Sequence, residues 1–171
     1  MNKIKVRNIV VEGVDASGKS TLCRHLHEVT GWPIALREGK PPTFEKTLEK
    51  IQRFQGYEGK IIDRHPLVSQ AIYGQTVRQD PNLPMELVTA IHEQGNLWIY
   101  CRCIDWNNPL GNHVVKLGED AEHLDALKLQ FPEILDLYDE WALHSAHIIY
   151  NNHGNMEFIG NCVKGALGLE C

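Results

Sequence analysis

The sequence predicts an α/β fold of three layers, in which helices cover both faces of a parallel β-sheet. Short apolar segments rich in Val and Ile alternate along the chain with segments whose apolar residues recur at helical spacing. Parallel strands require long crossover connections, which helices usually supply. The 171 residues contain no internal repeat, low-complexity stretch or linker. A single domain over residues 1–171 is therefore expected.

Strands and helices are expected to follow one another along the chain. Five short β-rich segments are predicted as strands, namely residues 5–13, 32–38, 59–65, 96–103 and 146–152. The predicted helices lie between and after them, over residues 19–30, 43–54, 66–79, 84–95, 119–144 and 155–168. Ligand binding is expected at the carboxyl ends of the strands, as in other open parallel sheets.

Residues with positional preferences mark several helix boundaries. Gly31 follows the first helix, where glycine readily adopts the left-handed conformation that ends a helix. Thr43 is placed to cap the second helix, and Pro66 lies in the first turn of the third, where a missing N–H costs nothing. Pro132 lies inside the acidic helical segment. Because a proline disfavours the α region at the preceding residue, a break is expected there.

Composition excludes several classes of protein. Apolar residues make up 43% and charged residues 23% of the chain, which is ordinary for a soluble globular protein. No apolar run is long enough to span a membrane, and the first residues show no signal-peptide pattern, so a cytoplasmic location is expected. The five cysteines include no CxxC pair and the nine histidines are scattered, so neither a disulfide framework nor a zinc site is predicted.

Charge is unevenly distributed between the two halves of the chain. Residues 1–80 carry 13 Lys and Arg against 9 Asp and Glu, whereas residues 81–171 carry 4 against 13. Anion binding is therefore expected in the first half, and the acidic second half is interpreted as a solvated face. The net charge of −5 argues against a general nucleic-acid binder, although it leaves a local basic groove open.

The segment from Gly13 to Ser20 predicts a phosphate-binding loop. Gly13 is followed by four residues and then by Gly18-Lys19-Ser20, between a predicted strand and a predicted helix, which is the context this motif requires. Inward-facing N–H groups and the helix N-terminus attract phosphate oxygens. Lys19 is expected to reach the β- and γ-phosphates, and Ser20 to bind Mg²⁺. The predicted phosphate contacts are Gly13, Ala16, Ser17, Gly18, Lys19, Ser20 and Thr21.

A second candidate site follows the third predicted strand, which ends in Asp63-Arg64-His65. A carboxylate at this edge of a sheet can position magnesium or accept a proton from an attacking hydroxyl group. The guanidinium of Arg64 can bind a phosphate through two parallel hydrogen bonds. A strand-end salt bridge is the structural alternative for the same residues.

Three short blocks of the sequence resemble thymidylate kinase, within the P-loop nucleotide-kinase superfamily. The phosphate loop carries Asp15 two residues after its first glycine, as in that family. Arg37-Glu38 matches the family's second-strand Arg-Glu pair. The DR-Tyr/His motif and the helix after it are matched by Asp63-Arg64-His65 together with Ser69, Gln70, Ala71 and Tyr73.

This resemblance implies a kinase that uses ATP and Mg²⁺ and transfers the γ-phosphoryl group to a pyrimidine deoxynucleotide such as dTMP. It also implies a five-stranded sheet in the order 2-3-1-4-5. The implied catalytic residues are Lys19, Asp63, Arg64 and Asp15, with Ser20 and Asp63 holding Mg²⁺. The implied acceptor contacts are Asp15, which would meet the sugar, and Arg37, Arg64, His65, Ser69 and Tyr73. Related kinases often pair through helices, so a homodimer is an open alternative.

The chain departs from the family pattern at three places. Residues 37–43, REGKPPT, replace a glycine-rich turn, and two prolines there remove two N–H donors. Only 24 residues separate Glu38 from Asp63, which leaves room for one helix. The candidate lid at residues 105–118 contains no arginine, and its basic residues are His113 and Lys116. Phosphoryl transfer needs cations around the transferred group, and this lid offers few of them. The short lid and the short segment before Asp63 predict an acceptor side that is more open than in a kinase of free nucleotides.

Two other functions stay open. Some bacteriophage kinases that resemble thymidylate kinase phosphorylate the 5-hydroxymethyl group of 5-hydroxymethyluracil in DNA, and an open acceptor side suits such a polymer. Trp106, His65 and Tyr73 would then stack on a base. The other alternative is a nucleotide-binding switch or NTPase, although the chain lacks both a Walker-B strand end and an Asn-Lys-x-Asp motif.

Arg102 is either a further cation of the site or a structural ion-pair partner.

Overall fold

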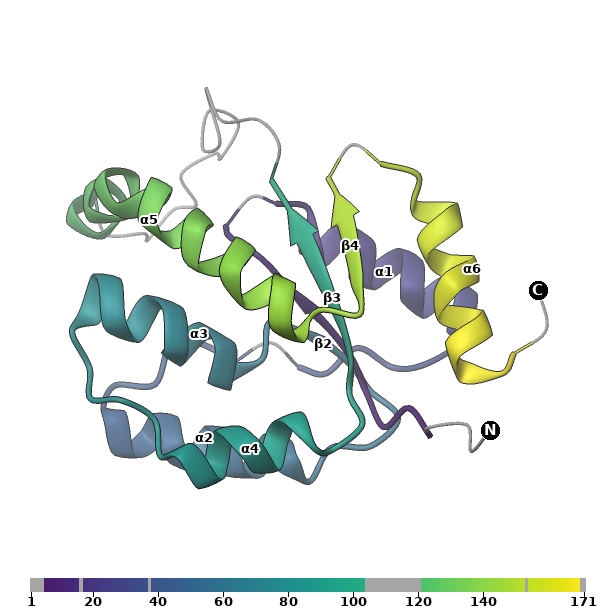
Figure 1. Ribbon diagram of the computed structural model, residues 1–171, viewed down its shortest axis with the longest axis horizontal. Helices are drawn as coiled ribbons and strands as arrows, with labels where there is room; N and C mark the ends of the chain where they lie inside the picture. Colours follow the sequence, from purple (N-terminus) through teal and green to yellow (C-terminus); the bar gives the residue numbers. More distant parts are fainter. Residues whose placement is uncertain (1–4, 16, 37, 104–120, 153, 170–171) are drawn as a thin grey trace.

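Four parallel strands form one sheet in the computed structural model, which describes residues 5–15, 17–36, 38–103, 121–152 and 154–169, with the backbone alone for 121–128. The strands are β1 (Ile9–Glu12), β2 (Ile61–Asp63), β3 (Leu97–Arg102) and β4 (Ile148–Asn151). Their order across the sheet is β2-β1-β3-β4 (Figure 1). The predicted α/β class with a parallel sheet is confirmed.

The prediction of five strands in the order 2-3-1-4-5 is wrong in one respect, because the described residues of the predicted segment 32–38 form no strand. Ile34 makes a single parallel bridge to Ile61, at the outer edge of β2. The Ala35 N–H donates to the Ile61 carbonyl, and the Ile61 N–H donates to the Pro33 carbonyl. Since Pro33 has no N–H of its own, the ladder cannot continue through it.

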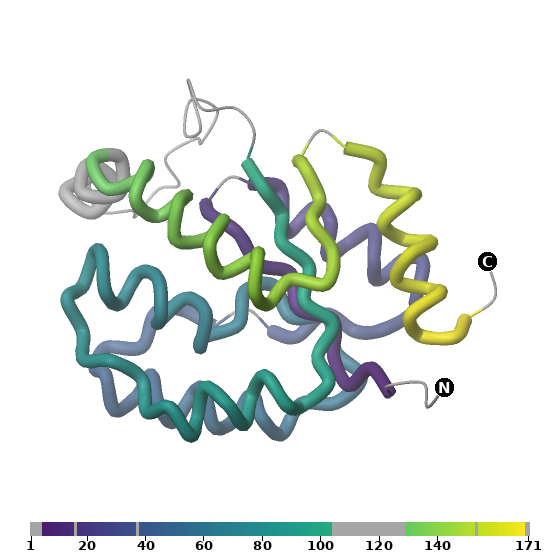
Figure 2. Tube along the Cα trace, viewed as in Figure 1, coloured from purple at the N-terminus to yellow at the C-terminus, as the bar shows by residue number. Residues whose placement is uncertain are grey.

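Alternating side chains along the strands divide the core into two parts. Val10, Ile62 and Trp98 point to one face of the sheet, whereas Ile9, Ile61 and other alternate residues point to the opposite face. The first face is covered by α2 (Phe44–Gln55), α3 (Pro66–Tyr73), α4 (Met85–His92) and α5 (Ala121–Ser145), and the second by α1 (Lys19–Thr30) and α6 (Met156–Leu167) (Figures 1 and 2). Among the described residues, no helix is both long and apolar enough to cross a membrane.

The predicted helix boundaries are confirmed at three positions. Gly31 ends α1 with a φ of 72°, in the left-handed region. The Thr43 side chain accepts the Lys46 N–H and so caps α2, and Pro66 occupies the first turn of α3. Beyond α3, the predicted helix continues as one π-helical segment, η1 (Gly74–Arg78).

The prediction of a break at Pro132 is wrong. Helix α5 runs without interruption from Ala121 to Ser145. A proline inside a helix lacks one N–H donor and crowds the preceding turn, at a cost of about 3 kcal/mol. Pro132 itself is exposed, but the residues that face the sheet from this part of α5 are buried: Phe131, Ile134, Leu135, Tyr138 and Ala142. Burial of each large apolar side chain contributes about 1.5–3 kcal/mol. Together, these buried residues stabilise α5 by more than the proline costs locally.

Candidate functional site

The phosphate loop lies between the end of β1 and the start of α1 and depends on two glycines. Gly13 has a φ of 143° and Gly18 a φ of 86°, values that residues with a side chain rarely adopt. A Cβ atom at Gly13 would lie 2.3 Å from the carbonyl oxygen of Cys101. The loop therefore rests directly on the backbone of β3, and no larger residue fits at its start.

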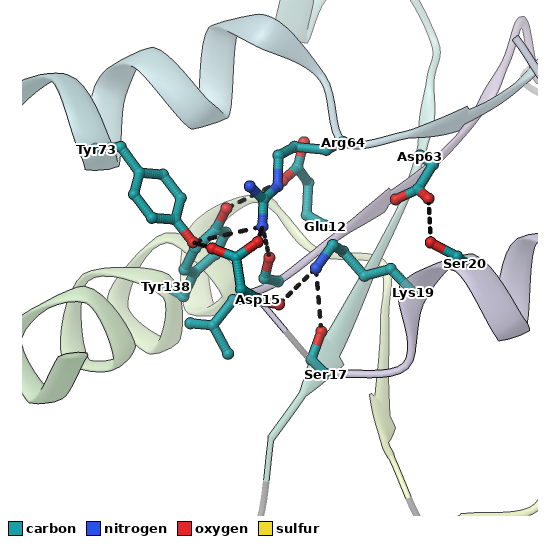
Figure 3. Close-up of polar contacts among 11 residues, drawn as sticks. Glu12, Asp15, Ser17, Lys19, Ser20, Asp63, Arg64, Tyr73 and Tyr138 are labelled. Atoms are coloured by element: carbon teal, nitrogen blue, oxygen red, sulfur yellow. Dashed lines mark hydrogen bonds and ion pairs between the residues drawn. The ribbon is translucent and has the colours of Figure 1, made fainter. Parts of the chain in front are cut away.

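Lys19, the first residue of α1, folds back over the loop. Its ammonium group donates to the Val14 carbonyl and to Ser17 Oγ, the latter at 3.4 Å (Figure 3). Burial, together with the charge of Arg64, lowers the pKa of Lys19 to about 8, although nearby carboxylates oppose the shift. A buried cation whose charge is only partly compensated favours an incoming anion such as a phosphate.

Ser20 and Asp63 form the second part of the donor side. The Ser20 hydroxyl donates to Asp63 Oδ2 at 2.6 Å, so the first turn of α1 meets the carboxyl end of β2. Magnesium prefers such oxygen ligands and is commonly bound through one or two of them together with substrate phosphates. No group of three His, Cys, Asp or Glu within the described ranges is arranged to hold a metal ion by itself. The pair fits Mg²⁺ that arrives with a nucleotide.

Arg64 follows β2 in a backbone conformation that is rare for residues with a side chain. Its φ is 73°, in the left-handed region, and its N–H donates to the Val11 carbonyl. One guanidinium nitrogen, Nη2, donates to the Gly13 carbonyl at 3.1 Å and to Asp15 Oδ1 at 3.0 Å. The central guanidinium carbon lies 5.1 Å from the centre of the Tyr73 ring. A non-glycine residue held in this region is a feature that clusters at functional sites.

Asp15 connects Arg64 to α3. Its Oδ1 accepts from Arg64, and its Oδ2 accepts from the Tyr73 hydroxyl at 3.2 Å. Burial by itself raises the pKa of Asp15, but the charges of Arg64 and Lys19 outweigh burial and hold that pKa below its usual range. Asp15 is therefore an anionic hydrogen-bond acceptor at neutral pH, placed next to the phosphate loop.

Most of the residues predicted for the site lie together in the structure. The group in Figure 3 includes Lys19, Asp63, Arg64, Asp15, Ser17, Ser20 and Tyr73. Thr21 is exposed on the first turn of α1, and Ser69 lies on α3 with its Oγ buried and without a hydrogen-bond partner among the described residues. The predictions for Ala16, Arg37, Trp106, His113, Lys116 and the lid at 105–118 lie outside the described residues.

His65 is placed differently from the other predicted acceptor contacts. Its side chain is buried, with the ring edge-on to Phe54 and Trp98 at centroid distances of 5.4 and 5.6 Å. Its Nδ1 accepts the Leu67 N–H and so caps α3. Burial and neighbouring cations lower the pKa of His65 to about 3, so the ring is neutral. These contacts are those of a structural residue.

Three residues of the site were not singled out from the sequence. Glu12, which ends β1, is fully buried and accepts the His65 N–H and the Tyr138 hydroxyl, the latter at 3.4 Å. A charged residue at the end of an apolar strand, VVEG, was the available signal. The Cys101 thiol donates to the Ser17 carbonyl at 2.7 Å, beneath the loop. No sequence pattern marks Cys101 or Tyr138.

Arg102, at the end of β3, forms an ion pair with a residue of α5. Its Nη2 lies 2.6 Å from Asp139 Oδ2, and its Nε donates to the same carboxylate. The Tyr100 hydroxyl also donates to Asp139, at 2.7 Å. Of the two roles that the sequence left open for Arg102, the structure shows the ion pair.

Comparison with known proteins bears on the fold. No family model matches the chain, and no curated protein is significantly similar to it. Among solved structures, YorR from Bacillus subtilis, in complex with phosphorylated GDP, resembles this chain with a TM-score of 0.68 and 19% sequence identity. The similarity covers 94% of this chain and 95% of YorR.

Two solved kinases share the same fold. Deoxyadenosine kinase from M. mycoides, bound to the products dCMP and dCDP, has a TM-score of 0.59 and 14% identity over 94% of this chain and 98% of that chain. Shikimate kinase from Acinetobacter baumannii, bound to shikimate, has a TM-score of 0.55 and 16% identity over 95% and 94% of the two chains. At these identities the likeness shows only that the chain shares its fold with these three proteins.

Proposed function

We propose that the protein is an ATP- and Mg²⁺-dependent phosphotransferase whose acceptor is a pyrimidine deoxynucleotide such as dTMP. The observation that carries this proposal is that two complementary half-sites meet at Lys19. The Ser20–Asp63 contact lies on one side and the Arg64–Asp15 ion pair on the other. The first suits the metal and triphosphate of a donor, and the second suits an acceptor that carries both a phosphate and a sugar hydroxyl.

On the donor side, loop N–H groups and Lys19 would hold the triphosphate, while Ser20 and Asp63 would hold the metal. When a nucleotide enters, the Lys19 ammonium exchanges the Val14 carbonyl for phosphate oxygens, which are stronger acceptors. Magnesium held by Ser20 and Asp63 would help to neutralise the negative charge that develops during transfer.

On the acceptor side, Arg64 would bind the acceptor phosphate and Asp15 a sugar hydroxyl, with Tyr73 holding both. Arg64 Nε has no hydrogen-bond partner among the described residues, and 22% of the Arg64 side chain is exposed, so a ligand that contacts the guanidinium can satisfy its remaining hydrogen-bonding capacity. The Tyr73 ring lies against the guanidinium and its hydroxyl fixes Asp15, which limits the freedom of both side chains. The resemblance to thymidylate kinase assigns the same task to Arg37.

With a monophosphate acceptor, the reaction needs no general base, because the nucleophile is an anionic phosphate oxygen. That oxygen bonds to the γ-phosphorus as the bond from the γ-phosphorus to the β,γ-bridging oxygen breaks, which gives ADP and a nucleoside diphosphate. The protein then contributes positioning and charge stabilisation. A hydroxymethyl acceptor must instead lose a proton, and Asp63 is the carboxylate predicted to accept it.

One observation favours the 5-hydroxymethyluracil alternative as a second candidate. Leu36, immediately before Arg37 in the sequence, is 86% exposed, and Glu38, Gly39 and Lys40 are exposed as well. Lys50 donates to the carbonyls of Glu38 and Gly39, which holds this segment back on α2. An exposed apolar side chain beside a predicted acceptor arginine suits contact with the sugar or base of a polymer.

The test offers separate acceptors to the protein with γ-labelled ATP and Mg²⁺. The acceptors are dTMP, dUMP, 5-hydroxymethyl-dUMP, and duplex DNA with or without 5-hydroxymethyluracil. Label in a pyrimidine nucleoside diphosphate supports the proposal, whereas label only in hydroxymethylated DNA replaces it with the second candidate. Release of label only as inorganic phosphate, with every acceptor, overturns both and identifies an NTPase. The Lys19→Ala variant controls for a contaminating kinase.

A further inference from the structure

Glu12 is a carboxylate that lies wholly inside the protein, at the end of β1. Its side chain is 0% exposed and points to the same face of the sheet as Val10, towards α3 and α5. Burial of a carboxylate is costly unless hydrogen bonds and opposite charges compensate it. The partners that make burial of Glu12 tolerable therefore indicate what this residue holds in place.

The first partner of Glu12 is the turn that carries Arg64. Oε1 of Glu12 accepts the N–H of His65, the residue directly after Arg64. Arg64 has the left-handed φ of 73°, which is energetically unfavourable for a residue with a side chain. A strained turn persists only where neighbouring groups determine it, and the Glu12 carboxylate is one such group. The direction in which the guanidinium leaves the backbone thus depends on Glu12.

The second partner of Glu12 is α5. Oε2 accepts the hydroxyl of Tyr138, which is fully buried, at 3.4 Å. The Tyr138 ring is parallel to that of Tyr100, with centroids 5.9 Å apart, and edge-on to that of Tyr73 at 6.1 Å. Tyr138 therefore packs against Tyr100 of β3, the strand beside β1, and against Tyr73, which fixes Asp15 and Arg64.

We propose that Glu12 is a positioning residue that, together with Tyr138, holds Arg64 in the orientation needed to bind the acceptor phosphate. One carboxylate oxygen accepts a hydrogen bond from the turn that carries Arg64, and the other accepts one from Tyr138 of α5. The position of Arg64 is therefore fixed relative to a helix on the same face of the sheet. This inference rests on the proposed function, because it takes Arg64 to contact the acceptor.

The charge of Glu12 adds a pH dependence to this arrangement. The titratable and charged groups that face it come from the phosphate loop, α1, the β2–α3 connection, α3 and α5: Asp15, Lys19, Arg64, His65, Tyr73 and Tyr138. Burial raises the pKa of Glu12 to about 7, although Arg64, the His65 N–H and Lys19 oppose the shift. A protonated Glu12 cannot accept both hydrogen bonds as a carboxylate does, so acceptor binding weakens on acidification.

The experiment compares the wild-type chain with Glu12→Gln, Tyr138→Phe, their double variant and Tyr57→Phe as a matched control. Glutamine keeps the size of Glu12 but has only one acceptor oxygen, and phenylalanine removes only the hydroxyl of Tyr138. Steady-state kinetics with ATP and dTMP give separate KM values, and calorimetry gives the Kd for ATP. Hydrogen exchange followed by mass spectrometry reports on the backbone of residues 61–67 and 134–142.

We expect Glu12→Gln to raise the KM for dTMP by about tenfold or more, and Tyr138→Phe by about threefold, with the Kd for ATP changed less than about twofold. The double variant should show less than the product of the two effects, because both act through one carboxylate. The wild type should show an acidic limb near pH 7 in kcat/KM for dTMP, and in Glu12→Gln this limb should move to lower pH, towards the pKa of the acceptor phosphate itself. Tyr57→Phe should behave as the wild type.

Two results would overturn the inference. The first is an equal effect of Glu12→Gln on ATP and on dTMP, which is the pattern of a general structural defect. The second is unchanged hydrogen exchange in residues 61–67 and 134–142 of that variant. If the wild type phosphorylates none of the acceptors, the proposed function fails, and the exchange measurement still decides whether Glu12 holds the Arg64 turn to α5.

Discussion

The Ser20 hydroxyl and the Asp63 carboxylate are joined by a hydrogen bond of 2.6 Å across 43 residues of sequence. Asp63 is the last residue of β2 and pairs in register with Val11 of β1, two residues before Gly13. The ladder between two strands therefore fixes Asp63 relative to the phosphate loop. The candidate metal site is set by the register of the sheet, which is a rigid element.

Lys19→Ala should abolish phosphoryl transfer while leaving the fold intact. Lys19 is the cation that lies inside the phosphate loop, and electrostatic stabilisation of this kind contributes a factor of about 10²–10³ or more to kcat. Circular dichroism and thermal unfolding check the fold, and label transfer from ATP checks the activity. Turnover within about threefold of the wild type would remove the loop from the mechanism.

Asp63→Asn should slow the chemical step more than it weakens ATP binding. Asparagine can still accept the Ser20 hydrogen bond, but it lacks the charge that attracts Mg²⁺. We expect kcat to fall by about 100-fold and the Mg²⁺ concentration for half-maximal activity to rise. A titration of Mg²⁺ at saturating ATP measures both. Equal losses in kcat and in ATP affinity would instead make Asp63 a ligand of the donor metal alone.

Arg64→Lys should impair the acceptor side selectively. Lysine keeps the positive charge, but its ammonium cannot replace a planar guanidinium that meets the Gly13 carbonyl, Asp15 and the Tyr73 ring together. The KM for the acceptor should rise by about tenfold or more, with a smaller change in the Kd for ATP. Measuring both constants in one buffer makes the comparison direct, and a loss confined to ATP would contradict the assignment.

Stability should depend on pH through Glu12. Its folded-state pKa of about 7 lies above the ordinary value of 4.5, so the folded state binds this proton more tightly than the unfolded state does. The resulting stabilisation is complete below pH 4.5 and is lost as the pH rises through 7. Glu12→Gln removes this dependence. The stability of the wild type relative to the variant should therefore fall by up to about 3 kcal/mol between pH 5 and pH 8.

Chemical denaturation of both variants at several pH values measures this difference, since groups that both chains share cancel. A difference that does not change with pH would show that Glu12 titrates with an ordinary pKa in the folded protein.

Local signals predicted the parts of the site that lie close together in sequence. The glycine spacing and the adjoining strand and helix located the phosphate loop, and Thr43 and Pro66 marked the starts of two helices. These features depend on backbone preferences within one turn, which a sequence displays directly. Asp63 and Arg64 were predicted because they lie at the end of a strand of the same sheet and directly after it.

Contacts between distant segments were beyond the reach of such signals. The Glu12–Tyr138 hydrogen bond joins residues that are 126 positions apart in the sequence. No sequence pattern near either residue predicts that the two lie in contact. The two errors have different origins. At α5, burial of the side that faces the sheet outweighs the local effect of Pro132. At the sheet edge, Pro33 leaves a single bridge at Ile34 instead of a strand, and this effect was underestimated in the sequence-based prediction.

The hydrogen bond from Cys101 to Ser17 gives the phosphate loop a chemical reporter of its own. Cys101 is fully buried, and burial raises the pKa of its thiol to about 11, so the folded protein presents no reactive thiolate there at pH 8. A thiol reagent can reach this sulfur only when the loop lifts from β3. The alkylation rate of Cys101 therefore reports how often the loop opens, and a bound triphosphate should lower this rate.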